Sequence, residues 1–427
     1  MKIALRNIFL AGFTVLMSGE YAFAQKIITL ESARQMALEK NNQLKIARQN
    51  IEAAKAAKIG AKAAMYPGIG AGVTGFYFGK PISDLLPGYG ASATLGLSEA
   101  LYNGGKVKLG RVIAQNDLDV QELQKTLSTS EVLLNVERSY WQIVALNEKL
   151  NLLNNYKTLL QALLSDLNNS LSAGTGYKND VLRARVQLNN ADLNILKMKD
   201  DLAIAKLSFA QSIGVDPKDA FVINDAVIGP FPTANDRAGD SVDNRSEISL
   251  LKKFMDRENL QVDFIKADLK PSIGVSVNGV TATGKKGINP GNDNSNFLGS
   301  YYSLLNISIP IWDGGATKQR IKAQTYKQAA QQIQLDDTRQ LILIEVKQAR
   351  LQLNQSVKRI ELSNTSLAQA EENLRLSNDR FKAGTIVSKD VIEAQNIWEQ
   401  ANSDLIDAKV QYKISDAVLR KAIGTLK

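Results

Sequence analysis

The chain lacks two residue types that carry much of protein chemistry, because its 427 residues include no cysteine and no histidine. Without cysteine there is no disulfide and no thiol for a lipid anchor. Without either residue, the commonest general bases, thiol nucleophiles and zinc ligands are missing. The pair Gly104–Gly105 is not followed by the Lys–Ser or Lys–Thr of a phosphate-binding loop. We therefore expect no enzyme activity, no metal site and no cofactor.

Aromatic residues are also scarce, at 6% of the chain. That proportion is thin for several compact cores, and long, narrow helical packing suits it better. The formal net charge is +9, which raises the question of a nucleic-acid partner. Lys and Arg are interleaved with Asp and Glu, however, and no basic cluster alternates with aromatic residues. We expect solvated helix faces and no nucleic-acid binding.

A short apolar stretch lies at the N-terminus. Lys2 and Arg6 precede the apolar residues from Ile8 to Met17, and Ala22-Phe23-Ala24 follows them. This is the layout of a cleaved secretory signal, and the apolar stretch is too short to span a bilayer. We expect residues 1–24 to be a signal peptide and the mature chain to be exported.

One short motif occurs twice. The glycine pairs of LYNGGK and IWDGG, Gly104–Gly105 and Gly314–Gly315, are 210 positions apart (314 − 104). The same offset, without a gap, aligns Ala173-Gly174-Thr175 with Ala383-Gly384-Thr385. A period kept over this length indicates an internal duplication. We expect a first repeat at 25–214, a linker or equatorial segment at 215–245 and a second repeat at 246–427.

The first repeat begins with a helix and two strands. Helical spacing over Ser32–Ala64 ends before Pro67. Strands around Val73 and Leu95–Leu97 then flank a loop near residues 85–90. Apolar and polar residues alternate in these strands, which predicts one apolar and one polar face.

The second repeat has the same strand pattern. One strand follows Pro271 and the other contains Leu305, Ile307 and Ile309, with a polar loop at 284–296 between them. No strand is apolar on both faces, as a central strand of a doubly wound sheet would be.

A long helix follows each glycine pair. The first helix runs from about Lys106 to Ser172, roughly 100 Å at 1.5 Å per residue. Its second half carries a leucine stripe of coiled-coil spacing that only Lys157 interrupts. The stripe comprises Leu146, Leu150, Leu153, Leu160, Leu164, Leu167 and Leu171. The chain reverses at Ala173-Gly174-Thr175 and returns as a helix over Asp180–Ile213, and the second repeat has the same hairpin.

Four strands in one chain are too few to cross a membrane, because an open sheet leaves its edges unpaired in lipid. Two chains would supply about eight strands, a barrel filled by its own side chains, whereas three would supply about twelve and leave a lumen. Short amphipathic strands in an exported chain are typical of the outer membrane of a two-membrane cell. We expect the helices to project into the periplasm.

The glycine pairs mark the joints between strand and helix. The backbone must change direction there within about two residues, and glycine permits this because it reaches positive φ. An ordinary loop that happens to contain two glycines is the alternative. The repetition in register favours joints at Gly104, Gly105, Gly314 and Gly315.

Taken together, these features resemble the TolC-type outer-membrane efflux channels along nearly the whole mature chain. The resemblance depends on TLESARQMALEKNNQL at 29–44, Pro67 and Pro271, the two glycine-pair motifs, DNRSEI at 243–248 and RFKAGTIVSKDVIEAQ at 380–395. It implies a homotrimer with a 12-stranded transmembrane barrel, continued by a long helical periplasmic tunnel. It also implies a channel that opens when docked to a periplasmic adaptor and an inner-membrane pump.

The resemblance assigns roles to residues at the helical turns. Asp390 and Glu393 fall where the family has two acidic residues at the pore constriction, and their spacing puts them on one helical face. In a trimer they would form two rings that favour cations. The alternative is a solvated acidic pair on a helix surface. The expected periplasmic tip, which would contact the adaptor, comprises Gly174, Thr175, Lys178, Asp180, Phe381, Gly384 and Thr385.

This chain departs from the best-known family members in the latch that closes the tip. It keeps an aspartate, Asp180, but has Phe381 and Ile386 where those relatives have a tyrosine and an arginine. Their polar latch cannot form here. Lys178, Lys382 and Lys389 lie beside the same turns, which suggests another ion pair with Asp180 or Asp390.

Two other functions use long helical hairpins. A periplasmic adaptor would show one hairpin flanked by small β domains, whereas this sequence predicts two hairpins in register with two strand pairs. A nonconducting coiled-coil scaffold or adhesin is the second alternative.

Overall fold

The computed structural model describes residues 26–84, 88–218, 220–233, 243, 245–284 and 297–426. The expected signal peptide at 1–24 lies outside the described residues, as do residues 85–87 and 285–296 of the two expected strand loops. The described chain is mainly helical and contains a four-stranded antiparallel sheet, which confirms the fold class expected for one chain.

The first repeat has six main elements. They are α1 (Leu30–Lys40), α2 (Asn42–Ala63), β2 (Gly68–Tyr77), β3 (Tyr89–Asn103), α3 (Lys106–Ser172) and α4 (Lys178–Ile213). A short 3-10 helix, Ile82–Asp84, lies between the two strands. The long helix and the returning helix therefore begin and end within two residues of the bounds expected from the sequence.

The second repeat has the same order of elements. They are α5 (Ser246–Lys266), a 3-10 turn at Ala267–Leu269, β5 (Ser272–Gly284), β6 (Phe297–Ser308), α6 (Ala316–Lys382) and α7 (Ser388–Ala422). The long helices α3 and α6 each have 67 residues, and they begin at positions with the 210-residue offset of the glycine pairs. The duplication is confirmed. Among the described helices, none is long and apolar enough to cross a membrane.

The helix expected over Ser32–Ala64 is broken at Asn41. The side chain of Asn41 accepts hydrogen bonds from the backbone N–H groups of Gln43 and Leu44, at 2.8 and 3.3 Å, and so caps the start of α2. Its ψ of 132° is not helical. A single helix was therefore wrong at this position, because a local side-chain cap replaces the helical hydrogen bonds.

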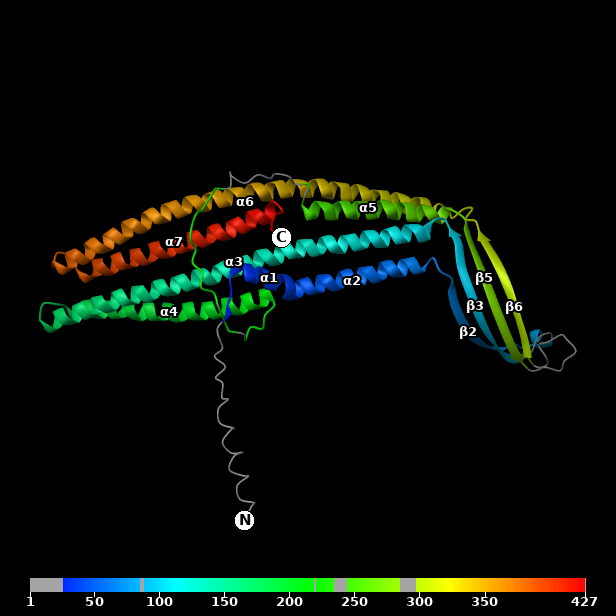
Figure 1. The fold of residues 1–427 in the computed structure, drawn as a ribbon, viewed down its shortest axis with the longest axis horizontal. Coiled ribbons are helices and arrows are strands. Elements are labelled where there is room, and N and C mark those ends of the chain that lie inside the picture. The colour runs from blue at the N-terminus through cyan, green and yellow to red at the C-terminus, as the bar shows by residue number, and fades with distance from the viewer. Residues whose placement is uncertain are drawn as a thin grey trace, which may run out of the picture. The chain divides into compact units, whose positions relative to one another are not determined.

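The four strands form one sheet in the order β2-β3-β5-β6 (Figure 1). Each repeat contributes a hairpin, and the hairpins meet where β3 pairs with β5 from Gly90–Gly284 to Asn103–Ser272. A β-bulge between Ala100 and Tyr102 shifts the register just before the first glycine pair. Such a bulge bends a strand and increases its twist.

Two compact units each combine segments of both repeats. The tip unit comprises the described residues up to Ala37 together with Val136–Pro230 and Arg359–Gln411. The sheet unit comprises Leu38–Asn135, Phe231–Lys358 and the described residues from Tyr412 onward. The boundaries fall inside α1, α3, α6 and α7, so the duplication and the compact units divide the chain differently.

In the tip unit, α3 buries a stripe that differs in part from the expected leucine stripe. Leu153, Tyr156, Leu160, Leu163 and Leu167 are all less than 9% exposed, whereas Leu171 is 37% exposed. Lys157 does not interrupt this stripe, since its ammonium lies 2.7 Å from Asp192 Oδ1 on α4. The predicted coiled-coil period of α3 was correct, but the residues that are buried lie on a face centred on Tyr156 and not on the whole predicted leucine stripe.

The expected linker is partly a buried segment of the tip unit. Its strand β4 (Phe221–Val222) pairs in parallel with β1 (Lys26–Ile27), and Ile223 and Val227 are almost fully buried. Side chains of α3 bind its backbone, because Asn147 donates to Ile223 O and Glu148 accepts from Val227 N.

Candidate functional site

The pairing register assigns the strand residues to two faces, because directly paired residues point to the same side of a sheet. One face is apolar. It carries Ile69, Val73, Tyr77, Tyr89, Leu95, Leu97, Val275, Val277, Tyr301, Leu305 and Ile307. The other face is mostly small or polar, with Gly70, Gly72, Thr74, Ser92, Thr94, Gly96, Ser98, Ser276, Asn278, Ser300 and Asn306. The expected alternation is therefore present in most of the sheet, with exceptions on both faces. The apolar face also carries Glu99, Thr281, Thr283 and Ser303, and the other face also carries Phe76, Val280, Tyr302 and Leu304.

The apolar face is exposed in the single chain. Val73, Tyr77 and Tyr301 are 80%, 81% and 79% exposed. A contiguous apolar surface of this kind marks contact with a membrane or a protein partner. Aromatic residues lie near the loop end of the strands, where Tyr77 pairs with Tyr89 and Phe297 begins β6. In membrane barrels, such residues form a girdle at the lipid–water boundary.

The four joint glycines have the backbone conformation that the sequence argument requires. Their φ angles are +69° and +92° for Gly104 and Gly105, and +68° and +85° for Gly314 and Gly315. Residues with a Cβ rarely adopt these angles. At Gly104 the space is also closed, since a Cβ would lie 2.4 Å from Ala267 O.

Each joint also has a side-chain cap that the sequence reasoning missed. Asp313 accepts from Gly315 N and Thr317 N at 2.9 and 2.7 Å, and Asn103 accepts from Val107 N at 3.3 Å. The hydrogen bonds from Thr317 lower the pKa of Asp313. The two caps occupy equivalent positions of the repeats. Asn or Asp directly before a glycine pair and a helix was the available signal.

Asp268 joins the two long helices of the sheet unit. Its carboxylate pairs with the Lys106 ammonium in the first turn of α3 and lies 2.9 Å from Arg320 Nη1 in α6. The hydrogen bond from Lys106 lowers the pKa of this carboxyl. Asp268 therefore links the first turn of α3 to α6 close to the two joints. No sequence pattern marked it, because the contact spans three separate segments.

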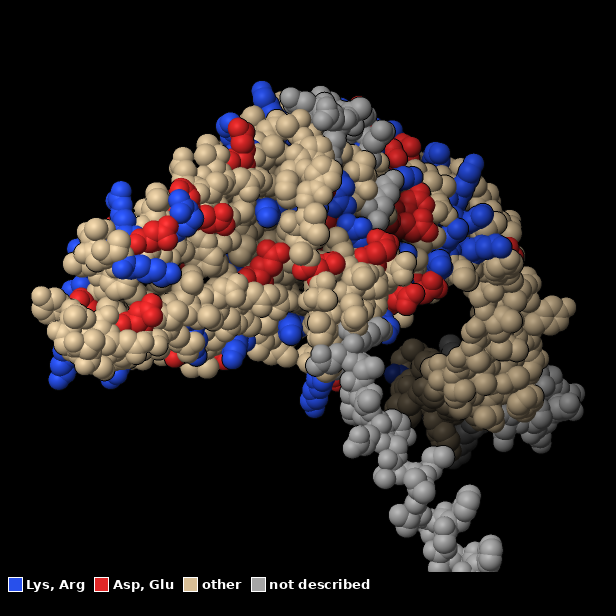
Figure 2. Space-filling view, turned by 60° about the vertical axis from the view of Figure 1, so that its left-hand side comes forward, with Lys and Arg blue, Asp and Glu red and all other residues tan. Residues whose placement is uncertain are grey.

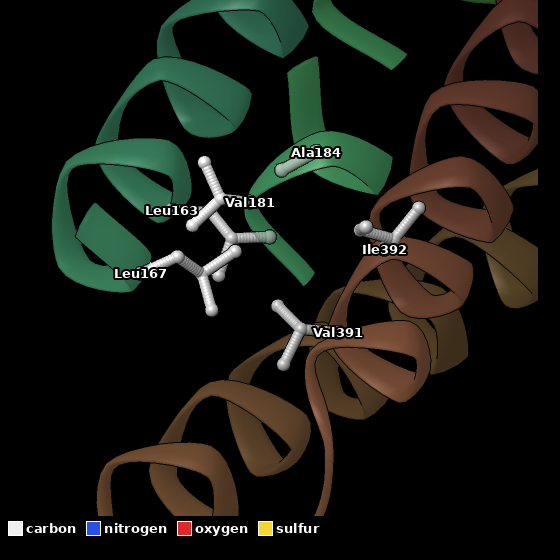
Figure 3. Packing of buried hydrophobic residues seen from close by; sticks show 6 residues of the cluster. All are labelled: Leu163, Leu167, Val181, Ala184, Val391 and Ile392. Atoms are coloured by element: carbon white, nitrogen blue, oxygen red, sulfur yellow. The ribbon is translucent and has the colours of Figure 1, made fainter. Parts of the chain in front are cut away.

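The two helical turns lie against a shared apolar cluster in the tip unit. Leu163 and Leu167 of α3 and Val181 and Ala184 of α4 point toward Val391 and Ile392 of α7 (Figure 3). Leu164, Phe381 and Ile386 pack at its margin. Phe381 and Ile386, which replace the polar latch residues of the best-known relatives, thus contribute apolar contacts instead.

Asp180 is bound by a hydroxyl in the structure. Ser388 Oγ donates to Asp180 Oδ1 at 2.7 Å, which links the first turn of α4 to the first residue of α7. Arg183 Nη1 is 3.9 Å from the same oxygen. The suggested pairing with a neighbouring lysine is therefore wrong for Asp180 in this chain. Asp390 accepts from Val387 N at 3.4 Å.

The other residues of the expected tip lie at or beside the two helical turns. Gly174 and Gly384 have φ angles of +76° and +71°. The hydroxyls of Thr175 and Thr385 close the preceding helices by donating to Ser170 O and Arg380 O. Lys178 is exposed at the start of α4. Asp390 and Glu393 are both exposed on α7, beside the buried Val391 and Ile392.

Comparison with known proteins identifies the family. The sequence model described as outer membrane efflux protein matches residues 33–215 and 241–425, which is most of the chain. Outer membrane protein TolC of Salmonella enteritidis is 22% identical over 346 residues, covering 78% of this chain and 69% of that protein. Outer membrane efflux protein BepC of Brucella suis is 21% identical over 425 residues, covering 98% of this chain and 90% of that protein.

The fold also matches a solved structure. The Campylobacter jejuni CmeC outer membrane channel superposes with a TM-score of 0.80 at 16% identity, covering 93% of this chain and 85% of that one. The resemblance found from the motifs is thereby confirmed. The chain belongs to the outer membrane efflux protein family.

Proposed function

We propose that three copies of this chain form the outer-membrane exit channel of a tripartite efflux or type I secretion system. As a member of the outer membrane efflux protein family, the chain is an outer-membrane efflux or secretion channel and not an enzyme. It conducts passively, and an inner-membrane pump delivers substrate to it through a periplasmic adaptor. A cleaved signal peptide at 1–24 exports it, and the repeats at 25–214 and 246–427 flank the segment 215–245.

The amphipathic sheet is the observation that carries this proposal. Its edge strands, β2 and β6, each pair on one side only in the described chain. In lipid an open edge is prohibitively costly, so copies of the chain must join edge to edge. Three copies give about twelve strands, enough for a barrel with a lumen. The small polar face then lines the lumen and the apolar face meets lipid.

The same arrangement argues against the alternatives. An adaptor or a nonconducting scaffold has no need of a sheet whose apolar side is exposed and whose other side is polar. Two hairpins that follow two strand pairs, in a chain matched by the family over both repeats, support a channel.

Two measurements test the channel. The mass of the purified protein in detergent is expected to equal three chains, and the protein is expected to carry ionic current across a planar bilayer. A monomer that never enters lipid would contradict the proposal. A trimer that enters lipid without conducting would support the rival scaffold.

Replacing both Asp390 and Glu393, as Asp390→Asn with Glu393→Gln, is expected to remove cation selectivity. The two exposed carboxylates share a face of α7, and three copies would concentrate six negative charges at the constriction, by the rule that rings of charge set selectivity. The reversal potential in a salt gradient measures the change, with the permeability ratio falling toward unity. Glu371→Gln, which removes one charge at an exposed position on α6, is a control for loss of charge away from the turn. Unchanged selectivity in the double variant would leave these residues as a solvated surface pair.

Replacing Ser388 by alanine is expected to increase the current through the closed channel. A hydrogen bond to a charged group contributes about 1.5–3 kcal/mol, so losing the Ser388–Asp180 contact would raise the open-to-closed ratio roughly tenfold or more. Asp180→Asn keeps an acceptor oxygen and should give a smaller increase. Ser403→Ala, on the same helix, is the control. Equal single-channel recordings for Ser388→Ala and Ser403→Ala would show that this contact does not hold the tip closed.

A further inference from the structure

The positive charge of the chain is concentrated beside the sheet. Four segments approach or leave the strands at its joint end, namely residues 51–66, 104–115, 264–271 and 313–327. They contain 12 Lys or Arg and three Asp or Glu, a net charge of +9 that equals the formal charge of the whole chain. The whole-chain value includes +1 from Lys2, Arg6 and Glu20 of the expected signal peptide, so the mature chain carries +8 and its remainder has a net charge of −1. The excess positive charge therefore belongs to this end of the sheet unit.

Six of these lysines form what we call the basic collar. They are Lys62, Lys108, Lys270, Lys318, Lys322 and Lys327. All six are exposed, and none makes an ion pair with another residue of the described chain. The nearby Asp268 already pairs with Lys106 and Arg320. Asp313 and Glu99 also lie near the joints, but Asp313 accepts from Gly315 N and Thr317 N, and neither carboxylate forms an ion pair with a collar lysine in the described chain. The six collar lysines therefore outnumber the carboxylates beside them.

Aromatic and apolar side chains separate the collar from the strands. Tyr66, Ile311 and Trp312 are 63%, 95% and 86% exposed, and they lie directly before β2 or just before the second glycine pair. Tyr102 ends the apolar face at the first joint. Exposed Trp and Tyr prefer the headgroup level of a bilayer, where their apolar rings and polar atoms are both satisfied.

The sheet itself is almost uncharged. Glu99 is the one charged residue in its four strands as described, and it lies near the joint end of β3. In Figure 2 the sheet forms a nearly uniform tan surface, and blue side chains gather where the helices of the same unit reach it. An apolar band, an aromatic boundary and a row of unpaired cations thus follow one another along the sheet unit.

We infer that the basic collar binds the headgroups of anionic phospholipids in the leaflet that faces the periplasm. The inference rests on the proposed function, which places the sheet in the outer membrane and the joints at its periplasmic side. Lysine ammonium groups are strongly hydrated point charges that suit phosphate, and clusters of them beside a membrane segment attract anionic lipid. The occupant is a phospholipid, because the segments that carry the collar adjoin strands whose apolar face would hold its acyl chains.

The test compares lipid retained by the protein in mixed bilayers of phosphatidylcholine and phosphatidylglycerol. Native mass spectrometry of the protein released from nanodiscs counts each bound lipid. The wild type is expected to retain phosphatidylglycerol several-fold above its bulk fraction. The variant Lys62→Gln, Lys108→Gln, Lys318→Gln, Lys322→Gln is expected to retain the two lipids at their bulk ratio.

The control removes the same number of charges elsewhere. Lys45→Gln, Lys197→Gln, Lys199→Gln, Lys347→Gln changes four exposed lysines outside the collar and outside the helical tips and should keep the wild-type enrichment. The assembly mass and circular dichroism of both variants verify folding. Equal enrichment in the two variants would overturn the inference. So would loss of bound lipid in inorganic phosphate but not in chloride of equal ionic strength, because the collar would then be a phosphate site.

A conductance measurement in pure phosphatidylcholine separates this inference from the proposed function. If the wild type conducts current but shows no preference for phosphatidylglycerol, the inference of lipid binding by the collar is refuted and the proposed channel function stands. Failure of the wild type to enter either bilayer would refute the channel, and the collar with it.

Discussion

Replacing Gly104 by alanine is expected to abolish or severely reduce assembly of the folded protein. The new Cβ would lie 2.4 Å from Ala267 O, which is backbone and cannot rotate away. The φ of +69° adds strain, because a residue with a Cβ pays about 1–2 kcal/mol in the left-handed region. The 3-10 turn at Ala267–Leu269 would have to move away from the start of α3, which would also separate Asp268 from Lys106.

Alanine substitutions at two further glycines distinguish the cost of backbone strain from the cost of a steric clash. Gly314 has a φ of +68°, but no atom lies within 4 Å of where its Cβ would be, so Gly314→Ala should cost only the conformational strain. Gly110 lies inside α3 with open space and no positive φ. Gly110→Ala should therefore be neutral or stabilise the helix by about 0.5–1 kcal/mol. Thermal unfolding of the detergent-purified protein ranks the three, and equal losses for Gly104→Ala and Gly314→Ala would show that the contact with Ala267 is unimportant.

Replacing Arg245 by methionine is expected to destabilise the sheet unit by about 1.5–3 kcal/mol, the usual contribution of hydrogen bonds to charged groups, because the guanidinium is buried while its partners Glu247 and Glu345 are partly exposed. The guanidinium is 5% exposed and donates to both oxygens of Glu247 at 3.0 and 2.6 Å. It also lies 3.2 Å from Glu345 of α6 and donates to Ala422 O at the end of α7. Burial lowers the pKa of Arg245, but the hydrogen bonds and charge of Glu247 outweigh this and raise it. The substitution would leave two carboxylates without their cation.

The shape of the guanidinium is part of this prediction. Arg245→Lys keeps the charge but cannot bind Glu247 through two nitrogens and reach Ala422 O as well, so an intermediate loss is expected. Arg257→Met is the control, since Arg257 and Asp117 form an ion pair that is 52% and 42% exposed and should contribute under about 1 kcal/mol. Chemical denaturation measures all three. A loss for Arg245→Met no larger than that for Arg257→Met would show that the buried cluster is not needed for stability.

Much of the fold followed from local patterns. Helical periodicity and flanking glycines predicted α3, α4 and α6 closely, because a long helix continues until a residue such as Gly174 ends it. Alternation predicted the two faces of the sheet, since strand geometry sends successive side chains to opposite sides. The break at Asn41 was missed, although an Asn within a helical pattern is a known N-cap signal.

The candidate site was predictable to the extent that backbone geometry demands a residue type. The joint and tip glycines could be found because only glycine takes positive φ without strain. The roles of Asp268 and Ser388 could not be found, because each acts through partners far away in the chain. Arg245 lies in the DNRSEI motif and its contact with Glu247 is local, but its contacts with Glu345 and Ala422 O could not be found from the sequence. Lys157 shows that burial, too, depends on distant segments. Several stripes of a leucine-rich helix have coiled-coil spacing, and the helices packed against it determine which stripe is buried.

The sequence by itself determined the duplication, the positions of the turns, the amphipathic strands and the family, because each of these is written in spacing along one chain. Only the tertiary structure decided that β3 pairs with β5 across the two repeats, that Asp268 joins both long helices and that the segment around Phe221 is buried. The physical reason is that pairing, burial and ion contacts depend on which surfaces meet, and residues far apart in sequence carry no mutual signal until the chain has folded.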